Sequence, residues 1–186
     1  MVTFPYLALG ANLPTGMQSA DETLRRAIAQ LETERFHIRD IGRFFHTPAF
    51  PQGSGPDYVN AAARAETDLP AEAVLAHLHA VEARLGRERT GRWAARTVDI
   101  DLLAIGDSIL PDGAEQARWR TLPPGRQHIE TPDRLILPHP RITERAFVLV
   151  PLADIAPLWQ DPVTGRRLPD LLAALDPAEV AAVRPI

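Results

Sequence analysis

The sequence predicts an α+β fold, in which one antiparallel sheet carries helices and the chain adds further elements at its C-terminal end. Short apolar or alternating runs, which are typical of strands, occur at residues 4–9, 36–47, 58–66 and 97–102. Two patterns of helical period lie between these runs, at residues 19–31 and 70–85. The chain has 186 residues, of which 45% are hydrophobic, and this is enough for one well-buried domain.

The first half of the pattern begins with residues 4–9, a short apolar run that we expect to be a buried strand. Ser19 and Glu22 then have the spacing of a capping box, which satisfies free backbone N–H groups where a helix begins. The apolar positions of this helix are Leu24, Ile28 and Leu31. A strand over 36–47 follows, and we place a bulge at Gly42.

The second half begins with a strand over 58–66, whose two faces are expected to carry Tyr58, Asn60 and Ala62 on one side and Val59, Ala61 and Ala63 on the other. Pro70 suits the first turn of the next helix, and Gly86 suits its end. The buried stripe of this helix is predicted to be Val74, Leu78, Val81 and Leu85. His79 and Glu82 share a different face.

Through residue 105 this order is β-α-β-β-α-β, the ferredoxin-like arrangement, with an antiparallel sheet and helices on one face. Residues 107–133 show no clear period, and a stretch of this length without structure is often functional or mobile. Residues 147–150 are apolar and expected to be buried, and short helices at 168–175 and 177–183 close the domain. We therefore predict a single domain over 1–186 with an insert at about 107–133.

Composition excludes several kinds of chemistry. All 20 basic residues are arginine, so the chain can have neither a P-loop lysine nor a Schiff-base lysine. It contains no cysteine, which excludes disulfides, thiolate metal sites and thiol nucleophiles. The net charge of −4 argues against general nucleic-acid binding. Because there is no long apolar run and no secretory pattern at the start, we expect a cytoplasmic protein without a membrane segment.

The most informative stretch is 82–101, in which an arginine-rich segment leads directly to Asp99 and Asp101. On a strand, residues two apart point to the same side, so the two carboxylates lie next to each other. Neighbouring carboxylates repel unless a cation or donor lies between them, and Mg²⁺ is commonly held by one or two carboxylates together with substrate phosphates. Arginine binds phosphate oxygens through paired hydrogen bonds. The stretch therefore predicts a site where a metal and a polyphosphate meet.

Each half of this stretch also has an ordinary interpretation. An Asp-x-Asp pair on a strand is common without a metal, and an arginine-rich loop is usually a solvated surface. Their direct succession favours the functional interpretation.

Several separate pieces resemble one family. They are Gly10-Ala-Asn-Leu13, Phe44-Phe-His-Thr-Pro48, Pro56-Asp-Tyr-Val-Asn60, the block from Gly86 to Asp101 with its arginines and Trp93, Leu137-Pro-His-Pro140, and Arg145-Ala-Phe-Val-Leu149. Together they resemble 6-hydroxymethyl-7,8-dihydropterin pyrophosphokinase, a family of folate biosynthesis. The resemblance runs from about residue 5 to residue 160, and the arginine, tryptophan and Asp-x-Asp block is its most specific part.

The resemblance implies transfer of the terminal pyrophosphoryl unit of ATP to the hydroxymethyl group of the pterin, with release of AMP. It also implies two Mg²⁺ ions, with Asp99 and Asp101 as metal ligands. Arg87 and Arg96 correspond to arginines that line the triphosphate, so the implied catalytic residues are Arg87, Arg96, Asp99 and Asp101. The implied partners are the two small molecules, ATP and the pterin, and we expect a monomer.

The resemblance assigns further residues to each substrate. For the nucleotide they are Arg89, Trp93, Leu102, Arg134, His139 and Arg145. For the pterin they are Thr47, Pro48, Phe50, Tyr58, Asn60 and Phe147, since a flat ring with a polar edge needs aromatic faces and amide partners. As alternatives, Trp93 could be a buried anchor, His139 structural, and Tyr58 and Phe147 ordinary core residues.

The chain departs from the family at three places. Ala94-Ala95 replaces a usual Gly-Pro, Thr90 and Ile136 stand where some members have polar nucleotide contacts, and the stretch 107–133 is longer than usual.

Two rival functions remain open from the sequence. One is another phosphoryl-transfer enzyme, such as a nucleotidyltransferase with an Asp-x-Asp metal site. The other is a non-enzymatic binding module for RNA or protein, which the two aspartates and the net charge of −4 argue against.

Overall fold

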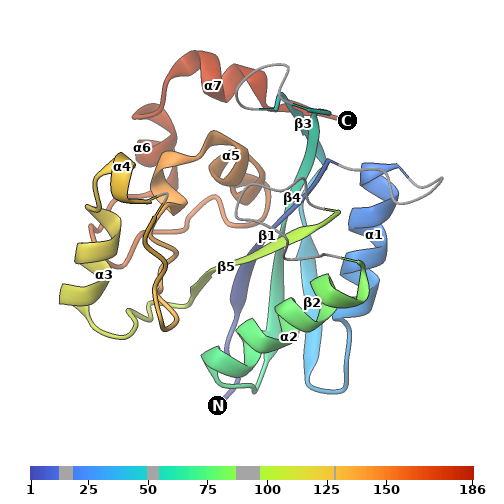
Figure 1. The fold of residues 1–186 in the computed structure, drawn as a ribbon, viewed down its shortest axis with the longest axis horizontal. Coiled ribbons are helices and arrows are strands. Elements are labelled where there is room, and N and C mark those ends of the chain that lie inside the picture. Colours follow the sequence, from blue (N-terminus) through green and yellow to red (C-terminus); the bar gives the residue numbers. More distant parts are fainter. Residues whose placement is uncertain (13–18, 50–54, 87–96, 128) are drawn as a thin grey trace.

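The computed structural model describes residues 1–12, 19–49, 55–86, 97–127 and 129–186. The strands are β1 (Pro5–Ala11), β2 (Phe36–Ile41), β3 (Phe45–Thr47), β4 (Tyr58–Thr67), β5 (Asp99–Ile105) and β6 (Arg184–Pro185). The helices are α1 (Ala20–Leu31), α2 (Ala71–Arg84), α3 (Gly113–Arg120), α4 (Pro124–Gln127), the 3-10 turn Ile142–Glu144, α5 (Ala146–Ile155), α6 (Leu168–Ala173) and α7 (Pro177–Ala182). Figure 1 shows how these elements surround the sheet.

The strands form one antiparallel sheet in the order β5-β1-β4-β3-β6, and β2 pairs with the other half of β4. Because β2 and β3 lie end to end against β4, they together occupy the place of one strand. The element order through β5 is then β-α-β-β-α-β, and β5 is the fourth strand position and one edge of the sheet. This confirms the predicted α+β, ferredoxin-like core.

The expected continuous strand over 36–47 is wrong in detail, because it divides into β2 and β3. Its register shift lies between Ile38 and Asp40, whereas we placed a bulge at Gly42. Gly42 lies in the break instead, where its N–H still donates to the Ala62 carbonyl oxygen at 2.9 Å. A Cβ at Gly42 would meet the Pro151 carbonyl oxygen at 3.2 Å, so helix α5 packs closely here and would have to move by a few tenths of an ångström to admit a side chain.

The ends of the first two helices follow from local sequence signals. The Glu22 N–H donates to Ser19 Oγ at 3.5 Å, and the Ser19 N–H donates to Glu22 Oε2 at 2.9 Å, which confirms the capping box. Pro70 is the N-cap of α2 and lies one position before the first turn in which we expected it. Gly86 follows α2 with φ of 82°, a left-handed conformation that glycine adopts without a steric cost.

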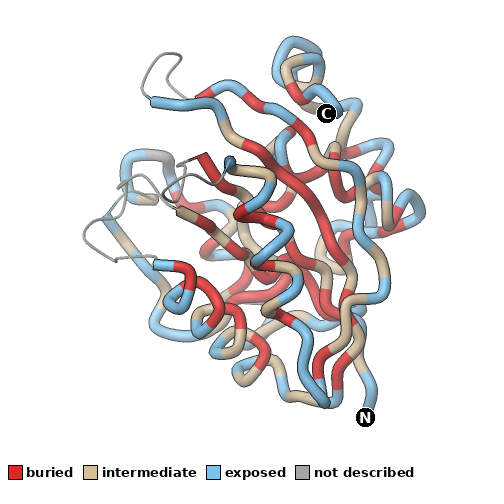
Figure 2. Tube along the Cα trace, turned by 90° about the vertical axis from the view of Figure 1, so that its right-hand side faces the viewer, coloured by how far each residue is buried: buried red, intermediate tan, exposed pale blue. Residues whose placement is uncertain are grey.

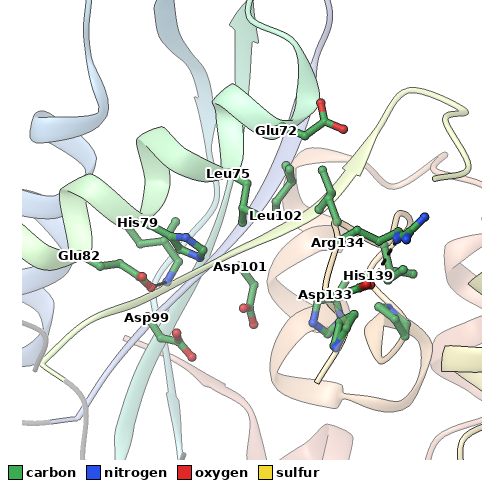
Figure 3. A pocket seen from close by; sticks show the side chains of 15 residues that line it. Glu72, Leu75, His79, Glu82, Asp99, Asp101, Leu102, Asp133, Arg134 and His139 are labelled. Carbon is green, nitrogen blue, oxygen red and sulfur yellow. Dashed lines mark hydrogen bonds and ion pairs between the residues drawn. The ribbon is translucent and has the colours of Figure 1, made fainter. Parts of the chain in front are cut away.

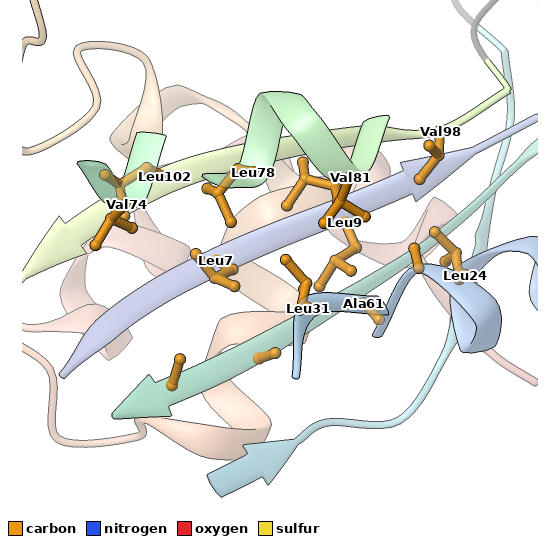
Figure 4. Packing of buried hydrophobic residues seen from close by; sticks show 14 of the residues in the cluster. Leu7, Leu9, Leu24, Leu31, Ala61, Val74, Leu78, Val81, Val98 and Leu102 are labelled. Carbon is orange, nitrogen blue, oxygen red and sulfur yellow. The ribbon is translucent and has the colours of Figure 1, made fainter. Parts of the chain in front are cut away.

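Helices α1 and α2 pack on one face of the sheet and enclose the main hydrophobic cluster, part of which is drawn in Figure 4. The predicted stripe of α2 is confirmed, since Val74, Leu78, Val81 and Leu85 all belong to this cluster. Strand residues on the same face complete it, among them Leu7, Leu9, Ala61, Ile100 and Leu102. The predicted alternation of strand 58–66 is therefore also correct.

The opposite face of the sheet is covered too, which the prediction of helices on one face did not include. Helix α5 packs there against the sheet, in a cluster with Ala62, Leu103 and Ala104, and α6 packs against α5. Figure 2 shows that buried residues run through the middle of the molecule. Within the expected buried run 147–150, Val148 and Leu149 are buried, but Phe147 is 41% exposed. The difference arises because the run begins a helix, and one face of that helix points away from the core.

The stretch 107–133, which the sequence left without secondary structure, contains α3 and α4. Its Trp119 and Leu122 form a small buried cluster with Ile136. Arg120 makes a buried ion pair with Asp161, with 2.5 Å between Nη1 and Oδ2. The described part of this stretch is thus packed onto the domain. Among the residues described, no helix combines the length and apolar character needed to cross a membrane.

Candidate active site

Asp99 and Asp101 project from the same side of β5, as predicted, and Figure 3 shows both carboxylates below the strand. They lie opposite Gly10 and Ala8 of β1, whereas the alternating Ile100 and Leu102 belong to the core cluster on the other face. Both aspartates are half-buried. The strand thus holds two carboxylates next to each other on a face that water and ligands can reach.

A cationic side chain lies beside this acidic pair. Arg145, the residue before α5, has its Nη1 atom 3.7 Å from Asp101 Oδ2. Burial lowers the pKa of the Arg145 guanidinium, and the Asp101 carboxylate offsets part of that fall. The same guanidinium lies 5.7 Å from the centre of the Phe147 ring. Arg145 therefore joins the acidic pair to an exposed aromatic face.

His139 completes this side of the site. Burial lowers the pKa of His139, while the Asp101 carboxylate opposes part of the shift. Its Nδ1 accepts a hydrogen bond from the Arg141 N–H at 3.1 Å, so a neutral ring carries its proton on Nε2. The backbone N–H of His139 donates to the Leu103 carbonyl oxygen at 2.7 Å, which fixes this segment along β5.

A pocket of about 470 Å³ surrounds the edge of the sheet at β5. Figure 3 shows its three walls, which are α2, β5 and the segment 132–140. The pocket has an apolar part and a polar part that contains both aspartates. Its lining residues are Glu72, Leu75, His79, Glu82, Asp99, Ile100, Asp101, Leu102, Pro132, Asp133, Arg134, Leu135, Ile136, His139 and Pro140.

The contribution of α2 to the pocket was not predicted, although the sequence places His79 and Glu82 on one helical face. Glu72 and Leu75 belong to the same face, because these four residues repeat at intervals of three and four. This spacing was a readable signal of a second stripe beside the core stripe. Glu82 is 1% exposed, and its Oε1 accepts the Ile100 N–H at 2.8 Å, so it also fixes the start of β5.

A second group of polar residues lies on the same face of the sheet. Asn60 of β4 is buried, and its Nδ2 donates to Thr47 Oγ1 of β3 at 2.6 Å. Gly10 of β1 pairs with Asn60 on one side and with Asp99 on the other. A Cβ at Gly10 would lie 2.9 Å from Asn60 Oδ1. The glycine therefore leaves room between the acidic pair and the Asn60 amide.

Besides Asn60 and Thr47, the other described residues assigned to the pterin are at least partly exposed. Tyr58 lies opposite Thr47 and is half-buried, and Pro48 is exposed. The alternative that Phe147 is an ordinary core residue is wrong, because it is 41% exposed. Asn12, which we did not assign, is 6% exposed, and its Nδ2 donates to the Pro56 carbonyl oxygen at 3.4 Å. Its place in the Gly10-Ala-Asn12 segment was the only sequence signal for it.

Two other assigned residues line the pocket. Leu102 belongs to β5, and Arg134 is exposed and paired with Asp133, with 3.2 Å between Nε and Oδ1. Phe50, Arg87, Arg89, Trp93 and Arg96 lie outside the described residues, as do Thr90, Ala94 and Ala95.

The donor set at the acidic pair fits a hard cation. In the described part of the chain, no group of three or more histidine, aspartate or glutamate side chains forms a complete metal cage. Two adjacent carboxylates supply the oxygen ligands with which Mg²⁺ is commonly held, while phosphate and water oxygens complete its coordination. The pair therefore suits a metal that arrives with a polyphosphate.

Comparison with known proteins bears directly on this arrangement. The model of a family described as 7,8-dihydro-6-hydroxymethylpterin-pyrophosphokinase matches residues 6–157. The chain belongs to this family. As a pyrophosphokinase it is a transferase of folate biosynthesis that moves pyrophosphate onto hydroxymethyldihydropterin and uses ATP as co-substrate.

Relatives of this pyrophosphokinase share about a third of its residues. The 2-amino-4-hydroxy-6-hydroxymethyldihydropteridine pyrophosphokinase of Synechocystis sp. is 35% identical over 167 residues, which are 88% of this chain and 74% of the relative. The enzyme of the same name from Methylorubrum extorquens is 34% identical over 184 residues, 98% of this chain and 99% of the relative. The enzyme from Pseudomonas aeruginosa is 34% identical over 174 residues, which are 94% of this chain and 93% of the relative.

Solved structures agree in fold. A triple mutant of Plasmodium falciparum HPPK-DHPS gives a TM-score of 0.67 at 14% identity over 93% of this chain. An HPPK-DHPS in complex with substrates gives a TM-score of 0.64 at 12% identity over 92% of this chain. The pyrophosphokinase chain spans only 44% and 43% of these two longer chains. At such identities the likeness establishes the fold alone.

Proposed function

We propose that the pocket beside β5 binds MgATP, that Asp99 and Asp101 hold two Mg²⁺ ions there, and that the pterin binds beside Asn60. The observation that carries this proposal is the row Asp99, Gly10 and Asn60 across three adjacent strands. It supports a polyphosphate site and a ring site side by side on one face, which is what transfer between two bound substrates requires.

The pocket supplies different surroundings to the two ends of a nucleotide. Leu75, Leu102, Leu135 and Ile136 offer an apolar surface of the kind that a purine base packs against. The polyphosphate end then lies near Asp99, Asp101 and His139. Arg87, Arg89, Trp93 and Arg96 stay assigned to the phosphates and to closure over the nucleotide, because arginine pairs with phosphate oxygens.

The pterin is proposed to lie between Tyr58 and Phe147, over the Asn60 amide. Asn60 already donates through Nδ2 to Thr47, so its Oδ1 is the atom left to accept a hydrogen bond from the ring. Phe147 presents an exposed face, and Arg145 lies on that face and beside Asp101. Pro48 and Phe50 are assigned to the same binding site on the resemblance.

In the reaction, the hydroxyl oxygen of the pterin attacks the β-phosphorus of ATP, the bond from that phosphorus to the α-phosphate bridge breaks, and AMP leaves. Bound Mg²⁺ would neutralise phosphate charge and acidify the attacking hydroxyl. The chain's own residues position the reactants: Asn60 orients the ring, while Arg145 and the Nε2 proton of His139 face the accumulating negative charge.

The product assay is the deciding experiment. Purified chain, MgATP and 6-hydroxymethyl-7,8-dihydropterin should give AMP and pyrophosphorylated pterin in equal amounts, and no AMP should form without the pterin. The rival nucleotidyltransferase function predicts pyrophosphate release instead, because attack at the α-phosphorus expels it. ADP as product would indicate a simple kinase. Either result would remove the proposal.

The number of metal ions and the oligomeric state are separate proposals. We expect two Mg²⁺ ions per MgATP-bound chain, measured by titration of binding of a non-hydrolysable ATP analogue against free Mg²⁺. We also expect a monomer of 20.5 kDa, measured by light scattering. Binding of a single Mg²⁺ ion would contradict the two-metal proposal. A mass near twice 20.5 kDa would contradict the proposed monomer.

Replacing Gly10 by alanine should weaken pterin binding more than nucleotide binding. The added Cβ would lie 2.9 Å from Asn60 Oδ1 and push the amide away from the ring site. We expect the KM for the pterin to rise about tenfold, the cost of one misplaced hydrogen bond, with a smaller change in the KM for ATP. Gly42→Ala is the matched control, because it is crowded by Asp154 and Pro151 instead. A pterin KM unchanged in Gly10→Ala would contradict the placement of the ring at Asn60.

A further inference from the structure

The inserted stretch 107–133 makes its contacts with the domain close to the nucleotide pocket. The wall of that pocket formed by 132–140 has no regular secondary structure except a single bridge, in which Leu110 and Leu137 exchange both backbone hydrogen bonds at 2.9 and 3.1 Å. Segments of this kind keep their shape only when something packs behind them. Three further contacts from the stretch supply that support.

The first contact is made by Gln116 of α3. Its side chain is fully buried, and Nε2 donates to the Pro138 carbonyl oxygen at 3.1 Å, one residue before His139. Within the described residues, no group donates a hydrogen bond to the amide oxygen of Gln116. Burying an amide costs stability unless its polar atoms are hydrogen-bonded, and here the Nε2 group makes its hydrogen bond to the segment that carries His139.

The second and third contacts lie on either side of the first. Trp119 and Leu122 pack in one cluster with Ile136, which itself lines the pocket. Gln127 of α4 accepts a hydrogen bond from the Arg141 guanidinium group. The backbone N–H of Arg141 in turn donates to His139 Nδ1. Together the contacts of the stretch reach residues 136–141, the same residues that bring Ile136 and His139 to the pocket.

We infer that the stretch 107–133 is a support for the nucleotide wall, and that Gln116 is a positioning residue for ATP binding through Pro138 and His139. This inference rests on the proposed function only in taking the pocket beside β5 as the nucleotide site. In this role Gln116 acts on the substrate through residues 136–141, which bring Ile136 and His139 to the pocket.

The test is Gln116→Met, which keeps the side-chain volume but removes the donor to Pro138. We expect the dissociation constant of an ATP analogue with a methylene α,β-bridge, measured calorimetrically with Mg²⁺, to rise about fivefold to tenfold, the effect of losing one positioning hydrogen bond. The pterin dissociation constant should stay within about twofold, since Asn60 is on another strand. The KM for ATP should rise more than kcat falls.

The matched control is Gln160→Leu, which removes a comparable bond from Nε2 to the Gly165 carbonyl oxygen at 2.7 Å in an exposed loop. A purely structural role for Gln116 predicts that both variants lower the melting temperature without changing nucleotide affinity, and this would overturn the inference. If Gln116→Met does not fold, Leu122→Ala tests the same wall from the Ile136 side with the same expected direction.

The outcomes also separate this inference from the proposed function. If the wild-type chain does not bind the ATP analogue, the nucleotide pocket itself is misplaced. If the wild type binds it and both Gln116→Met and Leu122→Ala bind it equally well, the pocket stands and the supporting role of the stretch is wrong.

Discussion

Asp101→Asn is expected to lower kcat/KM by about a thousandfold or more. The change preserves the size of the side chain but removes the charge that we propose holds a cation and that pairs with Arg145 at 3.7 Å. Stabilisation of phosphoryl charge by a metal is worth several kcal/mol, and each 1.36 kcal/mol is about a factor of ten in rate. Asp101 is half-buried and close to Asp99, so removing one of two like charges should leave the melting temperature nearly unchanged.

Two measurements make this prediction specific. AMP release measures the reaction, and binding of the non-hydrolysable ATP analogue at several Mg²⁺ concentrations measures the metal-dependent step without turnover. Asp107→Asn is the control, because Asp107 is an exposed aspartate just beyond β5. If Asp101→Asn keeps more than a tenth of wild-type activity, or if its analogue binding depends on Mg²⁺ as in the wild type, Asp101 is not a metal ligand.

Asp161→Ala is expected to reduce the free energy of unfolding by about 3–5 kcal/mol, the usual cost of removing one partner of a buried ion pair. The Asp161 side chain is fully buried, and its carboxylate accepts from Arg120 at 2.5 and 3.2 Å and from Thr164 Oγ1 at 2.6 Å. The substitution leaves Arg120, whose side chain is only 13% exposed, without its counter-charge. Chemical denaturation with a constant m-value measures the effect.

A cycle of variants identifies the source of that loss. Arg120→Leu combined with Asp161→Leu should recover a large part of the stability, because two apolar groups no longer require a charge partner. Asp68→Asn is the exposed comparison, since Asp68 and Arg35 are both about half exposed, and its effect on the free energy of unfolding should be much smaller. If Asp161→Ala and Asp68→Asn reduce the free energy of unfolding by similar amounts, burial of the Asp161 pair has no special effect.

The same pair predicts a dependence on pH. Burial raises the pKa of Asp161, but the hydrogen bonds from Arg120 and Thr164 lower it by more, so it lies below the usual aspartate value. A depressed pKa contributes stability that is fully present above the unfolded-state value of about 3.9 and is lost as the pH falls through the folded-state value. We therefore expect the stability difference between wild type and Asp161→Ala to shrink below about pH 4. A difference that stays constant from pH 7 to pH 3 would contradict this assignment.

Much of the fold could be predicted because its signals are local. The capping box at Ser19 and Glu22, the α2 stripe and the positive-φ glycine at 86 depend on residues within a few positions of one another. Alternation on a strand also follows from geometry alone, which is why the sequence suffices to place Asp99 and Asp101 on one side of β5. The block of arginines followed by Asp-x-Asp also indicated the family, and the comparison with known proteins confirmed it.

The sequence could not predict what depends on close approach between distant segments. Gly42 lies between β2 and β3 where α5 comes close to the sheet, and Phe147 is exposed because α5 turns that face outward. The stretch 107–133 has no clear hydrophobic period, because α3 is short and buries only Gln116 and Trp119. Their contacts, with Pro138 and Ile136, come from a later part of the chain.

Short-range spacing and residue type were therefore enough to predict the order of the elements, the position of the acidic pair on one side of β5, and the family. The tertiary structure decided which residues share a site. Antiparallel pairing brings Gly10 between Asp99 and Asn60, and packing places Arg145 and Gln116 next to segments far from them in sequence. Those neighbours are fixed by the register of the strands and the fit of side chains, which only the folded chain specifies.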